Sequence, residues 1–185
     1  MLSLTFDDPT GAAVHLLNVA ASVSNFKPVL QEIANDFYAE EKRVFGSRGG
    51  YGGRSEWEDL GPLYNKWKIA NYPARPILEC TGALRRSLTI PGAAGSDLKI
   101  KAMSLYVGSK VGTGKGGKKH KRAKNYNVAW LHDEGVESMK GVFEGVRMDG
   151  KRMPARRVFE ITDAQRQRWG DMLARYVASG GGKNP

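Results

Sequence analysis

Apolar residues recur at helical spacing between Pro28 and Phe45. They form one stripe of a helix, made of Val29, Leu30, Ile33, Phe37, Val44 and Phe45. A proline suits the first turn of a helix, and Gly46 suits its end. The segment is therefore predicted to be an amphipathic helix that buries this stripe.

The same spacing returns near the C-terminus. Thr162–Gln165 has the pattern of a capping box, which predicts a helix start. The residues after it follow the i, i+3, i+4, i+7, i+8 spacing of a core-facing stripe, made of Trp169, Met172, Leu173, Tyr176 and Val177. Gly180–Gly182 is expected to end this final helix.

Three further segments have shorter helical patterns. Residues 1–25 predict a lead-in followed by a short helix, with a start signal at Asp7–Thr10. Residues 57–67 are expected to be partly helical. Residues 77–88 are expected to contain a short helix with Thr81 as a candidate cap.

Between these helices the hydrophobic period changes to two, which is typical of strands. Two of the strands are expected to pair as a hairpin around Met103, and the turn dipeptide Asp149-Gly150 is expected to end a later one. Strands are predicted at Ser87–Ile90, Asp97–Ala102, Ser104–Ser109 and Val142–Met148, and a bend with a short strand is predicted at Met153–Phe159.

These elements predict an α+β fold, in which a small, mostly antiparallel sheet is flanked by an N-terminal and a C-terminal amphipathic helix. A length of 185 residues suits one domain. We expect a lead-in with a short helix at residues 1–25, a single domain at 26–179 with a basic flexible loop at 110–125, and a flexible tail at 180–185.

The formal net charge of +10 is concentrated in one stretch of the chain. Seven basic residues and no acid lie between Lys110 and Lys124; without them, 22 basic residues face 19 acidic ones. The nearly neutral remainder argues against a fold built around nucleic acid and predicts one basic appendage. The seven residues are Lys110, Lys115, Lys118, Lys119, Lys121, Arg122 and Lys124.

This basic loop is followed by an apolar platform, Tyr126–Gly135, which is expected to be buried. The loop has two interpretations. It could neutralise phosphates, in which case affinity would fall steeply with salt, or it could order against an acidic face of a protein partner.

Two other segments also have alternative interpretations. Gly46–Arg54, with the sequence GSRGGYGGR, resembles an RGG-type RNA-binding patch but also suits a flexible connector, which we favour. Trp57 and Trp67 could stack on bases, yet the acids around them favour packing into the core.

The sequence contains no recognisable catalytic or metal-binding set. Cys80 is the only cysteine, so no disulfide forms within the chain and a reducing compartment is expected. His132 and Glu134 have the H-x-E spacing of zinc deaminases without the paired cysteines, so a helix-end or hydrogen-bonding role is favoured for His132. The sequence has no P-loop or serine nucleophile elbow. We therefore expect a protein that is not an enzyme, with no cofactor or metal.

The N-terminus lacks a secretory signal, and the apolar stretch Ala12–Val23 is too short to span a membrane, so a soluble protein without a membrane partner is expected.

Four motifs occur in a fixed order along the chain: Trp57-x-x-Leu60-x-Pro62, Ile77-Leu78-x-x-Thr81-Gly82-x-Leu84-x-x-Ser87-Leu88, Tyr126-x-x-Ala129-x-Leu131-His132-x-x-Gly135 and Met153-Pro154-Ala155-Arg156-x-x-Phe159. In this order they resemble the virion morphogenesis (tail completion) family of Mu-like and related tailed bacteriophages. The resemblance covers roughly residues 28–177. Its motif positions include Trp57, Gly82, Leu84, Tyr126, His132, Gly135, Pro154, Arg156 and Phe159.

The resemblance implies a structural protein of the virion neck or tail, made in the host cytoplasm. Such a protein would form a homo-hexameric ring at the head-proximal end of the tail and join it to the head. Its implied partners are copies of itself, head-completion or connector proteins, tail tube or tail terminator proteins, and the DNA in the lumen. His132 and Arg156 would then fix the fold or a subunit contact. The alternative is a stand-alone basic nucleic-acid-binding protein.

Overall fold

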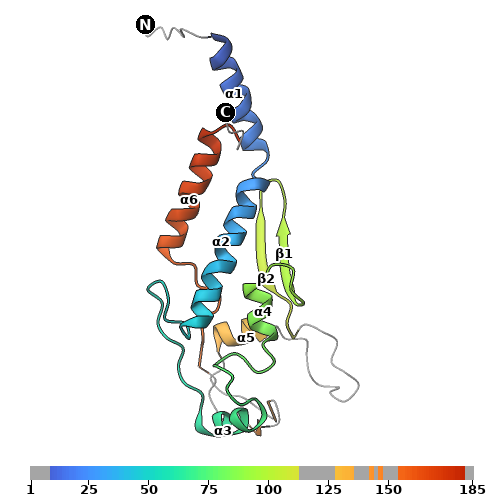
Figure 1. Ribbon diagram of the computed structural model, residues 1–185, viewed down its shortest axis with the longest axis vertical. Coiled ribbons are helices and arrows are strands. Elements are labelled where there is room, and N and C mark those ends of the chain that lie inside the picture. Colours follow the sequence, from blue (N-terminus) through green and yellow to red (C-terminus); the bar gives the residue numbers. More distant parts are fainter. Residues whose placement is uncertain (1–8, 113–127, 136–141, 144–145, 148–153, 182–185) are drawn as a thin grey trace. The chain divides into compact units, whose positions relative to one another are not determined.

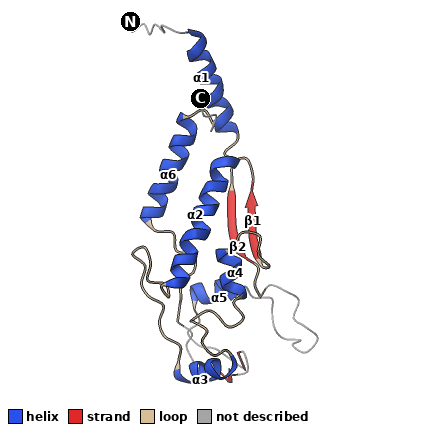
Figure 2. Ribbon diagram, in the orientation of Figure 1, coloured by secondary structure: helices blue, strands red, loops and turns tan. Residues whose placement is uncertain are grey.

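The computed structural model describes residues 9–112, 128–135, 142–143, 146–147 and 154–181 (Figure 1). The fold is α+β, as the sequence predicts, with helices at both ends of the described chain and a small hairpin sheet between them (Figure 2). The elements are α1 (Pro9–Ser24), α2 (Lys27–Gly46), α3 (Pro62–Asn71), α4 (Ala83–Thr89), β1 (Ser96–Ile100), β2 (Leu105–Ser109), α5 (Val128–Glu134), β3 (Val142–Phe143), β4 (Val146–Arg147) and α6 (Asp163–Ala178).

The chain divides into two compact units. The terminal unit consists of Met1–Asn35, Lys99–Tyr106 and Asp163–Pro185. The central unit consists of Asp36–Leu98 and Val107–Thr162. The segment boundaries expected from the sequence, at residues 25 and 179, stay a prediction.

In the terminal unit, α1 packs against α6 and the start of α2 is tied to two other segments. The Phe26 backbone N–H donates to the Ala102 carbonyl at 2.7 Å. The Tyr176 hydroxyl donates to the Asn25 carbonyl at 2.8 Å, and the rings of Phe26 and Tyr176 lie 6.0 Å apart. The expected stripe on α6 is half-buried along its whole length.

The central unit contains a hydrophobic core built from α2, α4, α5 and the segments between them. Its centre is an edge-to-face pair, Phe45 and Trp57, with ring centroids 5.2 Å apart. The buried core residues are Val44, Phe45, Trp57, Ile77, Leu84, Leu88, Ala129 and Val158. Six helical or loop segments supply this core, so its packing depends on how the loops are held.

The hairpin expected around Met103 is confirmed. β1 and β2 pair with each other, and the Lys101 N–H donates to the Ser104 carbonyl to close the turn. The alternation expected on β1 fails at Asp97, which is buried because its carboxylate lies 2.7 Å from the ammonium of Lys110.

The strand expected at Ser87–Ile90 is wrong, because these residues belong to α4 and the turn that ends it. Leu84, Ser87 and Leu88 are all buried, and this i, i+3, i+4 spacing lies on one face of a helix, whereas a strand would place Ser87 and Leu88 on opposite faces. The Ser87 hydroxyl donates back to the Leu84 carbonyl at 2.8 Å, as side chains in helices do.

Two further strand predictions are also wrong. The expected strand Val142–Met148 is interrupted, and its described residues form two short strands, β3 and β4, that pair antiparallel. The described part of Met153–Phe159 has the expected bend, at residues 158–159, but no strand. Its backbone groups bond to side chains of other segments, as the site below shows. The expected turn at Asp149-Gly150 lies outside the described residues.

Candidate functional site

The motif residues of three separate segments meet in the central unit. Arg156 is 3% exposed, and its guanidinium donates to the backbone carbonyls of Glu58 and Asp59, with Nε–O and Nη2–O distances of 2.9 and 3.1 Å. Burial lowers the pKa of Arg156 below its usual value. An arginine holds its charge even so, and its planar fork reaches two carbonyls at once. The side chain thus clamps the chain directly after Trp57.

Trp57 completes this connection from the other side. Its indole Nε1–H donates to the Arg157 carbonyl at 3.0 Å, while its ring lies in the hydrophobic core. The 57–59 and 156–157 segments are therefore joined by bonds in both directions. The expectation that Trp57 packs in the core is confirmed. Trp67 is half-buried, stacked on the ring of Tyr64 and edge-to-face with the ring of Tyr72.

The end of α5 forms the third part of the site. The Asp133 carboxylate accepts from the backbone N–H groups of Val158 and Phe159 at 2.8 and 3.2 Å. The His132 carbonyl accepts from the Arg156 N–H at 2.6 Å. These bonds take the place of a strand ladder for the 156–159 segment, which explains why strand composition there does not produce a strand.

The His132 side chain lies beside the same clamp. Its Nδ1 is buried and has no hydrogen-bond partner among the described residues. Burial, with a smaller effect from the Arg156 charge, lowers the pKa of His132 to about 4. The imidazole is therefore neutral at physiological pH. Gly135, with a φ of +69°, ends α5 in the left-handed conformation that glycine adopts readily.

A second buried charge cluster supports α2. Glu41 and Arg54 are both buried, with a carboxylate–guanidinium distance of 3.8 Å, and Arg54 also donates to the Glu160 carbonyl. Burial raises the pKa of Glu41 to about 8, although Arg54 opposes this shift. The sequence interpretation missed both residues. The signal was present for Glu41, because it follows Phe37 by four residues and precedes Val44 by three, on the apolar stripe.

The segment Gly46–Arg54 begins at the end of α2 and packs partly on the core. Its residues form ordered turns, Arg54 is buried, and Gly49 lies against the indole of Trp57. The segment thus connects α2 to α3 and packs on the central unit through Gly49 and Arg54, while Arg48, Gly50, Gly52 and Gly53 are exposed.

The other motif residues that the structure describes lie at a helix cap, in the core or at half-buried positions. Gly82 precedes α4 with a φ of +72°, and the Thr81 hydroxyl accepts from the Ala83 N–H at 3.3 Å. The helix cap is thus Gly82, with Thr81 assisting. Leu84 is buried in the core, while Pro154 and Phe159 are half-buried.

Of the basic loop, the structure describes residues 110–112, which include one of its seven cations, Lys110. Lys110 is anchored by its ammonium to Asp97 and by its N–H to the Gly95 carbonyl. Tyr126 and the other basic residues lie outside the described residues, and they are Lys115, Lys118, Lys119, Lys121, Arg122 and Lys124.

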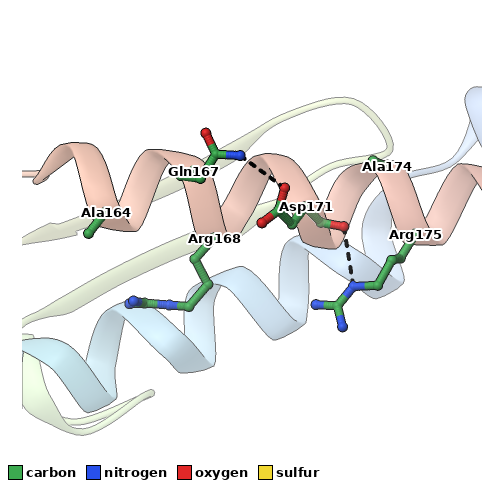
Figure 3. Close-up of a pocket in the computed structure, with 6 residues that line it drawn as sticks. All are labelled: Ala164, Gln167, Arg168, Asp171, Ala174 and Arg175. Carbon is green, nitrogen blue, oxygen red and sulfur yellow. Dashed lines mark hydrogen bonds between the residues drawn. The ribbon is translucent and has the colours of Figure 1, made fainter.

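The described residues line at least two hollows on the surface. An open groove of about 540 Å³ runs beside α3 in the central unit, with Leu60, Pro62 and Ile69 among its lining residues. A shallow hollow follows one side of α6 (Figure 3). There the Asp171 carboxylate accepts from Gln167 and its carbonyl accepts from Arg175, so these polar groups bond to one another.

Among the described residues, no three His, Cys, Asp or Glu side chains are grouped to hold a metal ion. Within the same part of the chain, no helix is long and apolar enough to cross a membrane. Against known proteins, no family model, no curated protein and no solved structure matches this chain.

Proposed function

We propose that this protein is a structural component of a tailed-bacteriophage virion, which completes the tail and joins it to the head. In this role it forms a hexameric ring at the head-proximal end of the tail. Its neighbours are head-completion or connector proteins on one side and tail tube or tail terminator proteins on the other.

One observation carries this proposal. The segments that resemble the tail completion family lie about 100 residues apart, yet in the central unit Arg156, Trp57 and Asp133 bond them into one cluster. Each of these bonds ends on a backbone group. Side chains used in this way fix the path of the chain, which supports a scaffold role for the motif residues.

Removal of the chain from its phage tests the proposal. We expect filled heads and separate tails to accumulate in the infected host, and wild-type protein supplied in trans to restore joined particles. Electron microscopy of the lysate is the measurement. Complete, infectious particles made without the chain would contradict the proposal.

The basic loop favours one alternative, a stand-alone nucleic-acid-binding protein, because most of the excess charge lies there. A variant with the loop cations from Lys115 to Lys124 changed to glutamine separates the two. If the alternative holds, the wild type binds duplex DNA, and the logarithm of its binding constant falls with the logarithm of the salt concentration with a slope of about −5 for six phosphate contacts. The variant then loses this binding. If the loop docks on a partner, duplex binding is unchanged and joining of heads to tails fails.

A further inference from the structure

The chain has a second basic stretch, at residues 60–96, which contain α3 and α4 of the central unit. It holds five basic residues and one acid. Outside the loop from Lys110 to Lys124, 22 basic residues face 19 acidic ones, and without residues 60–96 the numbers are 17 and 18. The positive charge that remains outside the loop is therefore concentrated here. The charged residues of the stretch are Lys66, Lys68, Arg75, Glu79, Arg85 and Arg86.

Three of these charges are used inside the central unit. The Lys68 ammonium is buried and donates to the carbonyls of Arg75 and Pro76. The buried Glu79 carboxylate forms an ion pair with Arg85 at 2.9 Å. The cations that are exposed and have no carboxylate partner among the described residues are Lys66, Arg75 and Arg86.

Two of the exposed cations meet beside Gly82. A Cβ added to Gly82 would lie 3.1 Å from Nη1 of Arg86 and 4.0 Å from Nη1 of Arg75. The Arg86 guanidinium is held there because its Nη1 donates to the Thr81 carbonyl at 3.2 Å. Since Gly82 has no side chain, the two guanidiniums flank the same space, one from the segment after α3 and one from α4. Like charges at such distances repel, and an anion held between them removes this repulsion.

The charge of the whole chain indicates which anion this is. A guanidinium is a planar fork that binds oxyanions through parallel hydrogen bonds, so the ligand of the pair is a phosphate or a carboxylate. A nucleic acid repeats its phosphates along its length. One such ligand therefore matches both the 60–96 and the 110–124 stretch of a chain of net charge +10, whereas a partner protein would need an acidic patch for each. A phosphodiester backbone fits best.

We infer that Arg75 and Arg86 together bind one phosphate of a nucleic-acid backbone beside Gly82. Each guanidinium donates to one of the two free oxygens of the phosphodiester, so the contact carries no base sequence. The absence of a side chain at Gly82 leaves the space that this phosphate takes. The site goes beyond the proposed function, which requires no nucleic-acid contact from the central unit.

Fluorescence anisotropy on the full chain, with a labelled duplex of about 20 base pairs at a series of salt concentrations, tests the site. Arg75→Gln and Arg86→Gln should each lower the affinity about ten-fold, and equally for duplexes of different sequence. The control Arg157→Gln removes the same charge from an exposed arginine of the same unit, and it should bind as the wild type does. Circular dichroism melts establish that the variants fold. Arg75→Gln is the safest of them, because the Arg75 side chain has no bond to lose among the described residues.

The double variant Arg75→Gln/Arg86→Gln shows whether the two side chains share one phosphate. The slope of the logarithm of the binding constant against the logarithm of the salt concentration counts the neutralised phosphates, so it should become shallower by about 1. A change of about 2 would mean two separate contacts and would overturn the shared site. A wild-type chain that does not bind the duplex, or arginine variants that bind it as Arg157→Gln does, would also overturn the inference. Weaker binding to poly-glutamate with unchanged duplex binding would assign the pair to an acidic protein partner instead.

Discussion

At the residue scale, buried cationic side chains serve as hydrogen-bond donors to backbone carbonyls that regular secondary structure does not pair. Arg54, Lys68 and Arg156 are all nearly inaccessible, and each donates to backbone carbonyls of a loop. Loops that enclose a core leave carbonyl groups without ladder partners, and an unsatisfied buried carbonyl is costly. These side chains satisfy such carbonyls while their aliphatic stems pack against apolar neighbours.

Arg156→Met tests the clamp at residue scale. The variant keeps an unbranched stem but leaves the carbonyls of Glu58 and Asp59 without their donor, so we expect a loss of about 3 kcal/mol in the free energy of unfolding. Urea denaturation is the measurement. Arg157→Met is the matched control, because Arg157 is exposed and only its carbonyl is used. Equal losses in both variants would refute the clamp.

Glu41 gives stability a pH dependence. Burial raises its pKa to about 8 in the folded chain, against the usual 4.5, so the folded state retains a proton that the unfolded state releases. Stability therefore falls as pH rises between these values, by about 1 to 2 kcal/mol from pH 6.5 to 8. We expect Glu41→Gln to remove this slope in urea titrations. The range from pH 6.5 to 8 avoids the titration of His132. Because His132 is neutral in the folded chain, it makes stability rise with pH, but only between about pH 4 and 6.5. An unchanged slope in the variant would show that Glu41 is ionised in the folded chain.

At the scale of elements, the sequence predicted what depends on local periodicity. Helices α2 and α6 have long apolar stripes, and the β1–β2 hairpin has alternating residues on both sides of a short turn. The incorrect predictions concern segments whose secondary structure depends on a partner that is distant in the sequence. Strand composition at residues 154–159 is overridden by the Asp133 carboxylate, which takes two backbone N–H groups from that segment.

The turn after α2 offers a test at this scale. Gly49 has a φ of +96°, and a Cβ added there would lie 2.7 Å from the Trp57 indole. Gly52 has a φ of +68° with open space around it. Gly49→Ala should therefore lower the thermal midpoint clearly more than Gly52→Ala, with an additional cost of about 1 to 3 kcal/mol from the clash with a buried ring. Similar midpoints for the two variants would mean that the turn does not pack on Trp57.

At the scale of the whole molecule, the motifs were visible in the sequence but their convergence was not. Spacing along the chain identified Trp57, His132 and Arg156, whereas the bonds that join their segments link residues 24 to 100 positions apart. Glu41, Arg54 and Lys68 escaped notice for a related reason. A charged residue is usually exposed, and only its three-dimensional partners reveal that it is buried.

The number of copies that assemble on isolated tail tubes tests the central claim most directly. Native mass spectrometry of the tube-bound protein, together with rotational averaging of tube ends in electron micrographs, gives that number. The account predicts a closed hexameric ring at one end of each tube. Binding along the whole tube, or no binding to tubes that lack their own end protein, would contradict it.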